Sequence, residues 1–173
     1  LIALITMTID HYAIIFRPES SFILRGIGRI SFPLFCFCIS EGLKHTKNLN
    51  KYMLRLFLFS LVSHVPFSIF HTASSLGPIE FSHLSYLNVI FPFFISSVVV
   101  FFYQKFREEK NIYLKVLYVL LIVGIYFSLY FVNTDYGQFG VALVFLLYLS
   151  KNKYEKALII AIFMCFKYFM LSP

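Results

Sequence analysis

Long apolar segments are the feature of this sequence that most limits how it can fold. Seven of them follow one another along the chain, separated by polar connections. A helix needs roughly 17–25 mostly apolar residues to cross the hydrocarbon core of a bilayer. The segments cover residues 1–16, 25–43, 52–70, 84–104, 113–132, 137–149 and 156–171. The sequence therefore predicts an all-α fold, a polytopic transmembrane helix bundle of about seven spans.

The composition supports one integral membrane domain over residues 1–173. Of the 173 residues, 60% are hydrophobic and 13% are charged, and the mean hydropathy is +0.81. Soluble domains are nearer half apolar and a quarter charged, so we expect much of this apolar surface to face lipid. Leu1 already lies in an apolar run, and we expect the first span to be truncated. Segment 137–149 is short enough to be re-entrant or mismatched.

Positive charge is concentrated in three of the connections. Those after the second, fourth and sixth segments hold ten Lys or Arg, against two on the other side. The ten are Lys44, Lys47, Lys51, Lys105, Arg107, Lys110, Lys115, Lys151, Lys153 and Lys156. Basic connections stay in the cytoplasm, which predicts that the chain ends outside. The net charge of +7 then reflects topology and contact with the lipid bilayer, and we expect no nucleic acid partner.

Several polar residues fall at one depth, in the outer parts of the spans. They are Asp10, His11, Arg25, Arg29, His64, His71, Asn88 and Asp135. An ionisable side chain inside a span is a functional candidate, because burying it uncompensated is costly. We interpret the Asp10–His11 pair as functional. We interpret Arg25 and His71 as members of a structural ion pair or as side chains that reach the interface. Neighbours on a helix do not face each other, so we expect Asp10 to pair with another helix, for example through Arg29.

A second polar group follows the second span at the cytoplasmic end. Glu41 lies near the end of that span, and Arg55 in the next span is its expected salt-bridge partner. The stretch between them is basic and holds Lys44, His45, Lys47, Lys51 and Tyr52. Lys and Arg at this depth suit a phosphate-bearing ligand. The same residues also fit a plain topology signal.

The three cysteines do not indicate a disulfide or a metal site. Cys36 and Cys38 lie two residues apart on an expected helix, so they point to different faces, and Cys165 stands alone. The Cys and His residues lack the spacing of metal ligands. We interpret the cysteines as small apolar helix residues and expect no metal.

The second and third spans carry a familiar pattern. The stretch GRISFPLFCFCISEGLKHTKNLNKYMLRLFLFSLVSHVPF, together with IDH in the first span, resembles the TraX family. The matching positions are Asp10, His11, Gly28, Arg29, Phe32, Pro33, Phe35, Phe37, Glu41, Gly42, His45, Thr46, Tyr52, Arg55, Leu56, Ser63, Pro66 and Phe67. The late stretch TDYGQFGVALVFLLYL is similar to the family as well. A match of this length is far more specific than a lone short motif.

The resemblance implies a membrane-bound acetyltransferase of the bacterial inner membrane. TraX proteins are associated with N-terminal acetylation of conjugative pilin, and acetyl-CoA is the expected donor. The implied reaction moves an acetyl or acyl group from cytosolic acetyl-CoA to an extracytoplasmic amine or hydroxyl, on a protein N-terminus or a glycan.

The resemblance also suggests roles for the polar residues. His11 would act as general base, because imidazole exchanges protons near neutral pH. Asp10 would hold Arg29 or support His11, and Arg29 or Asn88 would polarise the thioester carbonyl. The expected donor-binding residues are Glu41, Lys44, His45, Lys47, Tyr52 and Arg55. The expected substrate residues are His64, Asn88 and Asp135.

Two other functions fit the same sequence. One alternative is a non-enzymatic membrane subunit of a conjugation or secretion apparatus. The other is a small transporter with a polar relay. Binding of acetyl-CoA distinguishes the enzyme, whereas ion-coupled flux through Asp10 and His11 distinguishes the transporter. The sequence has no glycine-rich phosphate loop, nucleophile elbow or zinc motif, so it does not fit the soluble catalytic templates.

Overall fold

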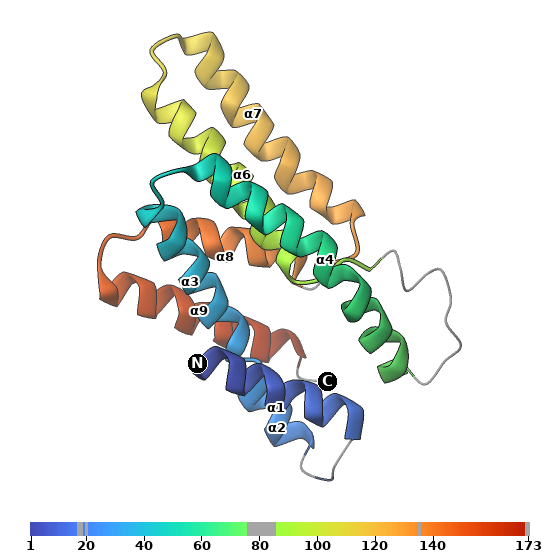
Figure 1. The fold of residues 1–173 in the computed structure, drawn as a ribbon. Helices are drawn as coiled ribbons and strands as arrows, with labels where there is room; N and C mark the ends of the chain where they lie inside the picture. The colour runs from blue at the N-terminus through green and yellow to red at the C-terminus, as the bar shows by residue number, and fades with distance from the viewer. Residues whose placement is uncertain (17–18, 20, 76–85, 135, 172–173) are drawn as a thin grey trace.

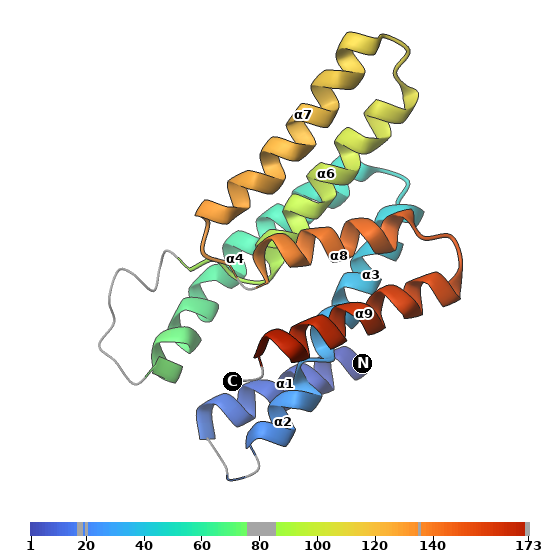
Figure 2. The ribbon, with the colours of Figure 1, turned by 180° about the vertical axis from the view of Figure 1, so that it is seen from behind.

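The computed structural model is built from helices throughout the part of the chain that it describes. It describes residues 1–16, 19, 21–75, 86–134 and 136–171, and for residues 71–75 and 167–171 only the backbone. The helices are α1 (Ile2–Phe16), α2 (Ser21–Gly28), α3 (Ser31–His45), α4 (Leu49–Ser75), α6 (Ile90–Glu108), α7 (Ile112–Ser128), η1 (Leu129–Phe131), α8 (Gly137–Leu149) and α9 (Lys153–Leu171). Figures 1 and 2 show them as one bundle, with the α1–α2 pair at one end.

Four helical segments are long and apolar enough to cross a membrane. They are Ser21–His45, Leu49–Phe70, Ile90–Glu108 and Ile112–Phe131, and α1 and α8 are shorter apolar helices. Because α2 and α3 together make one interrupted segment, the described helices correspond to the seven predicted segments. The predicted class, a helical membrane bundle, is confirmed.

The second predicted segment is not a continuous helix. A turn at Arg29 and Ile30 separates α2 from α3. Pro33 is the third residue of α3; it has no N–H to donate to the carbonyl of Arg29, and its ring crowds that carbonyl. The interruption therefore follows from the GR-x-x-FP pattern, and it places Arg29 at the break.

The fourth helix begins later than predicted, at Ile90 instead of residue 84. Residues 84 and 85 lie outside the described part of the chain, and residues 86–89 are in turn or extended conformations. Leu87 donates its N–H to the carbonyl of Asn133 at 2.9 Å, so this segment is tied to the connection before α8. Hydropathy alone cannot locate the start of this helix, because the residues just before Ile90 are as hydrophobic as those within α6.

The core lies where α3, α6 and α8 meet. Cys36 of α3, Val100 of α6, and Val144 and Leu147 of α8 are fully buried there. At the end where these helices begin, the Phe32 ring stacks on Tyr136 with ring centroids 3.6 Å apart. By contrast, α4 and α7 bury little of their surface, as expected of helices whose apolar side chains face lipid.

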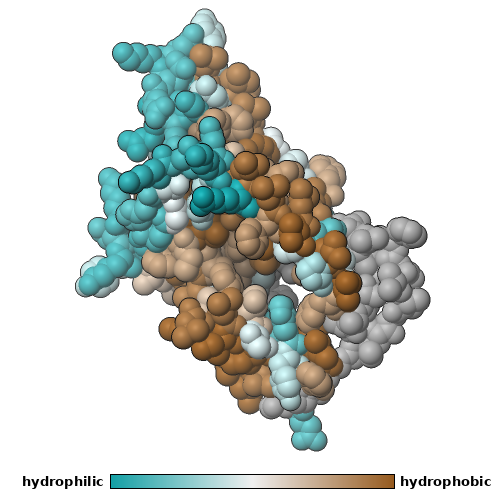
Figure 3. All heavy atoms as spheres, in the orientation of Figure 1, coloured by the Kyte–Doolittle hydropathy of each residue, from teal (hydrophilic) through white to brown (hydrophobic). Residues whose placement is uncertain are grey.

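The three basic connections gather along one edge of the molecule. Figure 3 shows hydrophilic residues following this edge, past the ends of α3, α6 and α8, while hydrophobic residues cover most of the remaining face. This grouping agrees with the prediction that the three connections lie on the same side. We refer to this edge as the basic end and to the opposite side as the far end.

Candidate functional site: two polar groups in the bundle

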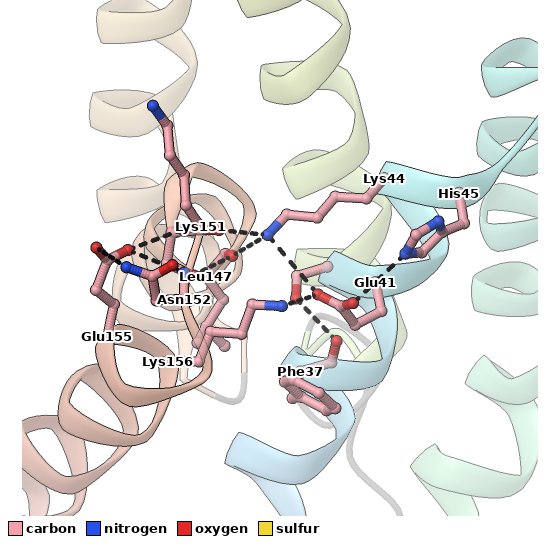
Figure 4. A network of polar contacts seen from close by, with 11 residues as sticks. Phe37, Glu41, Lys44, His45, Leu147, Lys151, Asn152, Glu155 and Lys156 are labelled. Atoms are coloured by element: carbon pink, nitrogen blue, oxygen red, sulfur yellow. Dashed lines mark hydrogen bonds and ion pairs between the residues drawn. The ribbon is translucent and has the colours of Figure 1, made fainter.

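A network of ionic contacts ties three helices together at the basic end (Figure 4). Lys156 of α9 donates from Nζ to Oε1 of Glu41 in α3, at 2.6 Å. Lys44 Nζ lies 3.7 Å from the same oxygen, and His45 Nε2 lies 3.6 Å from Oε2. The side chains of Glu41 and Lys156 are only 29% and 16% exposed, so the pair is better shielded from solvent than an ordinary surface pair.

Lys44 also closes the end of α8. Its ammonium donates to the carbonyl oxygens of Leu147 and Ser150, at 2.9 and 2.7 Å. Carbonyls in the last turn of a helix lack intrahelical partners and carry the negative end of the helix dipole. The charge of Lys44 is therefore already offset by protein groups, and these contacts give it a structural role.

The expected salt bridge between Glu41 and Arg55 is wrong. Glu41 pairs with Lys156, Lys44 and His45, whereas Arg55 is exposed on α4. After their short connection α3 packs against α8 and α1, and α4 packs against α6. Arg55 is carried away from Glu41, and the first turn of α9 takes its place.

The connection before α9 is organised by Glu155. Its carboxylate accepts from the backbone N–H of Lys151 at 2.8 Å and from that of Asn152 at 3.3 Å. These backbone hydrogen bonds, with the Lys151 charge as a smaller contribution, hold the pKa of Glu155 below its ordinary value. The carboxylate thus fixes the start of the helix that carries Lys156.

Tyr52 lies against Gly42 where α3 and α4 diverge. A Cβ on Gly42 would stand 2.5 Å from the Tyr52 hydroxyl oxygen and 3.0 Å from Cζ. Only glycine lets the ring reach the backbone of α3 so closely. The expected donor-binding residues are thus divided: Glu41, Lys44, His45 and Tyr52 lie along the end of α3, while Lys47 and Arg55 are exposed.

Asp10 belongs to the contact between α1 and α2. Its Oδ1 lies 3.9 Å from Nε of Arg25, so the expectation that Asp10 pairs with another helix is confirmed, with Arg25 in place of Arg29. The two helices touch closely here, because a Cβ on Gly28 would overlap Asp10 Cβ and stand 2.8 Å from its Cα. Of the two interpretations of Arg25, a structural ion pair and a side chain that reaches the interface, the contact with Asp10 supports the first, and the side chain is 49% exposed.

His11 joins α1 to α4 instead. Its ring lies 4.5 Å from that of Phe70 between centroids, at an interplanar angle of 46°, and its side chain is half-buried. From Leu49 to Phe70, α4 rises by about 31 Å. His11 is therefore near the far end of the bundle, well separated from the basic connections. Arg29, half-buried at the break after α2, makes no ion pair with a described residue.

Asn88 clamps two helices. Its Nδ2 donates to the Ser60 carbonyl at 2.7 Å and to the Ser63 hydroxyl at 3.1 Å. Its Oδ1 accepts from the backbone N–H groups of Ile90 and Phe91 at 3.1 and 3.2 Å. Both ends of this buried amide are engaged, so its contacts are structural, and the expected contact with substrate stays a prediction.

Replacing Asn88 by alanine is expected to lower the free energy of unfolding by about 1–3 kcal/mol, because both the cap of α6 and the clamp to α4 are lost. The measurement is reversible unfolding in detergent. Asn111→Ala is the matched control, since Asn111 caps α7 at an exposed position through Tyr113 N–H. It should cost about 0.5–1 kcal/mol. Equal losses for the two variants would show that the clamp adds nothing.

The remaining candidates are only partly described. His64 is half-buried on α4, and Ser68 donates to its carbonyl at 2.8 Å. The side chain of His71 and all of Asp135 lie outside the described residues. Among the described residues, no group of three or more His, Cys, Asp or Glu is placed to hold a metal ion.

The sequence analysis does not find the contacts that three residues make in these groups. Lys156 was counted only as one of ten basic residues, and no spacing links it to Glu41. Phe70 was one phenylalanine among many. Gly28 was noted within a family pattern, but its contact with Asp10 depends on how two helices cross. Each omission concerns a contact between helices, which periodicity along one helix does not encode.

Fold and contacts together define a multi-pass helical membrane protein with polar groups at two levels. The family model described as "TraX protein" matches residues 1–172, and the chain belongs to the TraX family. It is also similar to the "Probable fimbrial assembly protein FimC, serogroup H1" of Dichelobacter nodosus, with 40% identity over 65 residues. That match covers 36% of this chain and 27% of the relative. No solved structure matches the chain.

Proposed function

We propose that this protein is a membrane-embedded acetyltransferase that uses cytosolic acetyl-CoA and an extracytoplasmic acceptor. The observation that supports the proposal best is the separation of its polar groups. Exposed Lys and Arg side chains suited to phosphates lie in the connections at the basic end, and a half-buried histidine lies near the far end. Transfer across a membrane needs a charged docking site on one side and a proton acceptor toward the other.

The donor would be held by the cations that the protein leaves unengaged. Lys44 and Lys156 are occupied by Glu41 and by the end of α8. His45 is exposed but also lies against Glu41. Lys47 and Arg55 are exposed, and a guanidinium offers two parallel donors to a phosphate. In this proposal Arg55 is the main phosphate contact, and Tyr52 lies beside the donor. Glu41 and Lys44 support the site by joining α3 to α8 and α9.

Chemistry would take place at His11. The acceptor nitrogen or oxygen attacks the thioester carbonyl carbon, and the imidazole of His11 takes the acceptor's proton. The bond from carbon to sulfur then breaks, and coenzyme A leaves as a thiolate that receives the proton back from His11. Arg29 would stabilise the oxyanion formed on the carbonyl oxygen. Asp10, through Arg25, would hold α1 against α2.

The acceptor is proposed from the relatives. The name of the Dichelobacter nodosus relative concerns fimbrial assembly, which favours the N-terminus of a pilus or fimbrial subunit. A surface glycan with a free hydroxyl is the other acceptor class. The same name favours a second candidate function, a non-enzymatic membrane subunit of a fibre-assembly apparatus. Binding of the donor separates the two functions.

Replacing Arg55 by alanine is expected to weaken retention of coenzyme A on the purified protein by about tenfold, because one charge-assisted phosphate contact is worth roughly 1.5–3 kcal/mol. Retention is measured by equilibrium dialysis with labelled coenzyme A. The matched control is Arg107→Ala, which removes an exposed arginine from the same end of the bundle but from α6. Equal loss of coenzyme A retention in both variants would show that retention depends on the total positive charge at this end and not on a specific contact with Arg55. No retention by the unmodified protein would favour the non-enzymatic function.

A further inference from the structure

Helices α3 and α4 diverge after the connection that joins them. The two helices are joined by a short connection but make little contact along their lengths. Figure 3 shows the surface hollowed between α4 and the α1–α2 pair. We call this feature the α3–α4 hollow. The helices that border it carry Cys38 on α3, Tyr52, Arg55 and Phe59 on α4, and His11 on α1.

One face of α4 runs along the hollow from end to end. Tyr52 and Phe70 lie eighteen positions apart, about five turns at 3.6 residues per turn, so they share this face. Tyr52 meets Gly42 of α3 at the narrow end, and Phe70 meets His11 of α1 at the other. Between them, Arg55 is exposed and Phe59 is 67% exposed. The face is thus covered at both ends and open in the middle.

The facing wall belongs to α3. Cys38 lies four residues before Gly42, which puts both on the same side of the helix. Gly42 is the residue that meets Tyr52, so this side of α3 turns toward α4, and Cys38 is exposed on it. The next cysteine, Cys36, is buried in the core on the other side. The thiol of Cys38 therefore lies on the wall of the hollow.

The two ends of the hollow differ in chemistry. The narrow end lies toward the basic end: Lys47 is exposed in the connection between the two helices, and Arg55 is exposed three residues beyond Tyr52. The far end holds the imidazole of His11 against Phe70. A ligand that fits has an anionic head at the basic end, a slender uncharged arm, and a reactive group at its tip.

From these contacts we infer that the α3–α4 hollow binds the acyl-pantetheine arm of the donor, with the phosphates at Arg55 and the thioester toward His11. This inference rests on the proposed function and adds the path of the donor. From Arg55 to Phe70, α4 rises by about 22 Å. An extended pantetheine arm, taken as peptide-like units, spans roughly 16 Å. The arm therefore brings the thioester to within about one turn of the contact between His11 and Phe70.

Cysteine labelling tests the path. The protein in nanodiscs is treated with N-ethylmaleimide, and modification of Cys38 and Cys165 is followed by peptide mass spectrometry. Cys165 is exposed on α9 and serves as the internal control. With acetyl-CoA at ten times its Kd, Cys38 should be modified about tenfold more slowly, with Cys165 unchanged. Adenosine 3′,5′-bisphosphate, which carries phosphates but no arm, should protect neither cysteine.

The outcomes separate the path from the function. Acetyl-CoA that binds in an Arg55-dependent way yet leaves Cys38 labelling unchanged overturns the path and leaves the acetyltransferase proposal standing. Equal protection by the bisphosphate also overturns the path. Absence of acetyl-CoA binding overturns both. If Cys38 reacts too slowly without ligand, Phe59→Cys on the opposite wall provides a second reporter with the same expected protection.

Discussion

Replacing His11 by phenylalanine is expected to lower acetyl transfer about 10²–10⁴-fold, the usual contribution of a positioned general base. Phenylalanine is chosen over alanine because the His11 ring packs against Phe70 in α4. A phenyl ring retains that aromatic contact and cannot take a proton. The measurement is transfer of labelled acetyl from acetyl-CoA to an acceptor peptide, at matched levels of membrane-inserted protein.

A control variant separates proton transfer from packing. Phe70→Leu removes the aromatic contact and leaves the imidazole, so it should retain most of the transfer activity while weakening the junction of α1 and α4. Donor retention should be unchanged in His11→Phe, because the proposed phosphate contacts lie at the other end of α4. Full transfer by His11→Phe at normal protein levels would remove His11 from the mechanism.

Replacing Gly28 by alanine is expected to destabilise the fold by about 1–3 kcal/mol, the usual cost of forcing atoms into a packed contact. The added Cβ would overlap Asp10 Cβ and stand 2.8 Å from its Cα, so α1 and α2 must separate. Separation also weakens the contact between Asp10 and Arg25. The measurement is the midpoint of thermal unfolding in detergent, together with the yield of folded protein.

Gly26→Ala is the matched control for this prediction. It lies in the same helix, and a Cβ there would meet nothing within 4 Å. Alanine favours a helix over glycine by about 0.5–1 kcal/mol, so this variant should be as stable as the unmodified protein or more so. The two variants differ only in the crowding at Asp10. Similar stability for both would show that α1 and α2 are not packed as described.

The helical class and the number of segments were predictable because they depend on local hydrophobicity. A run such as residues 113–132 is apolar at nearly every position and cannot be stable in water by itself. The common side of the basic connections was predictable for a similar reason, since Lys and Arg counts do not depend on packing. Hydropathy does not predict the interruption after Gly28 or the late start of α6. The first depends on the missing N–H of Pro33, and the second on the hydrogen bonds from Ile90 and Phe91 to Asn88.

The partners of the candidate residues were harder to predict. The sequence indicates that Asp10 needs a cation on another helix, but Arg25 and Arg29 lie four residues apart on the next segment and look equivalent. Glu41 was assigned to Arg55 because Arg55 is near in sequence; its partner Lys156 comes from a helix more than a hundred residues away. Such contacts depend on how α3, α4 and α9 cross, which a single sequence does not contain.

The most direct test of acetyl transfer is made in cells. Extracytoplasmic proteins and surface glycans are compared by mass spectrometry in cells with the protein, without it, and with His11→Phe. The proposed function predicts an acetyl group on a defined N-terminus or hydroxyl that is present only with the unmodified protein. The same acetylation pattern in all three strains would contradict it.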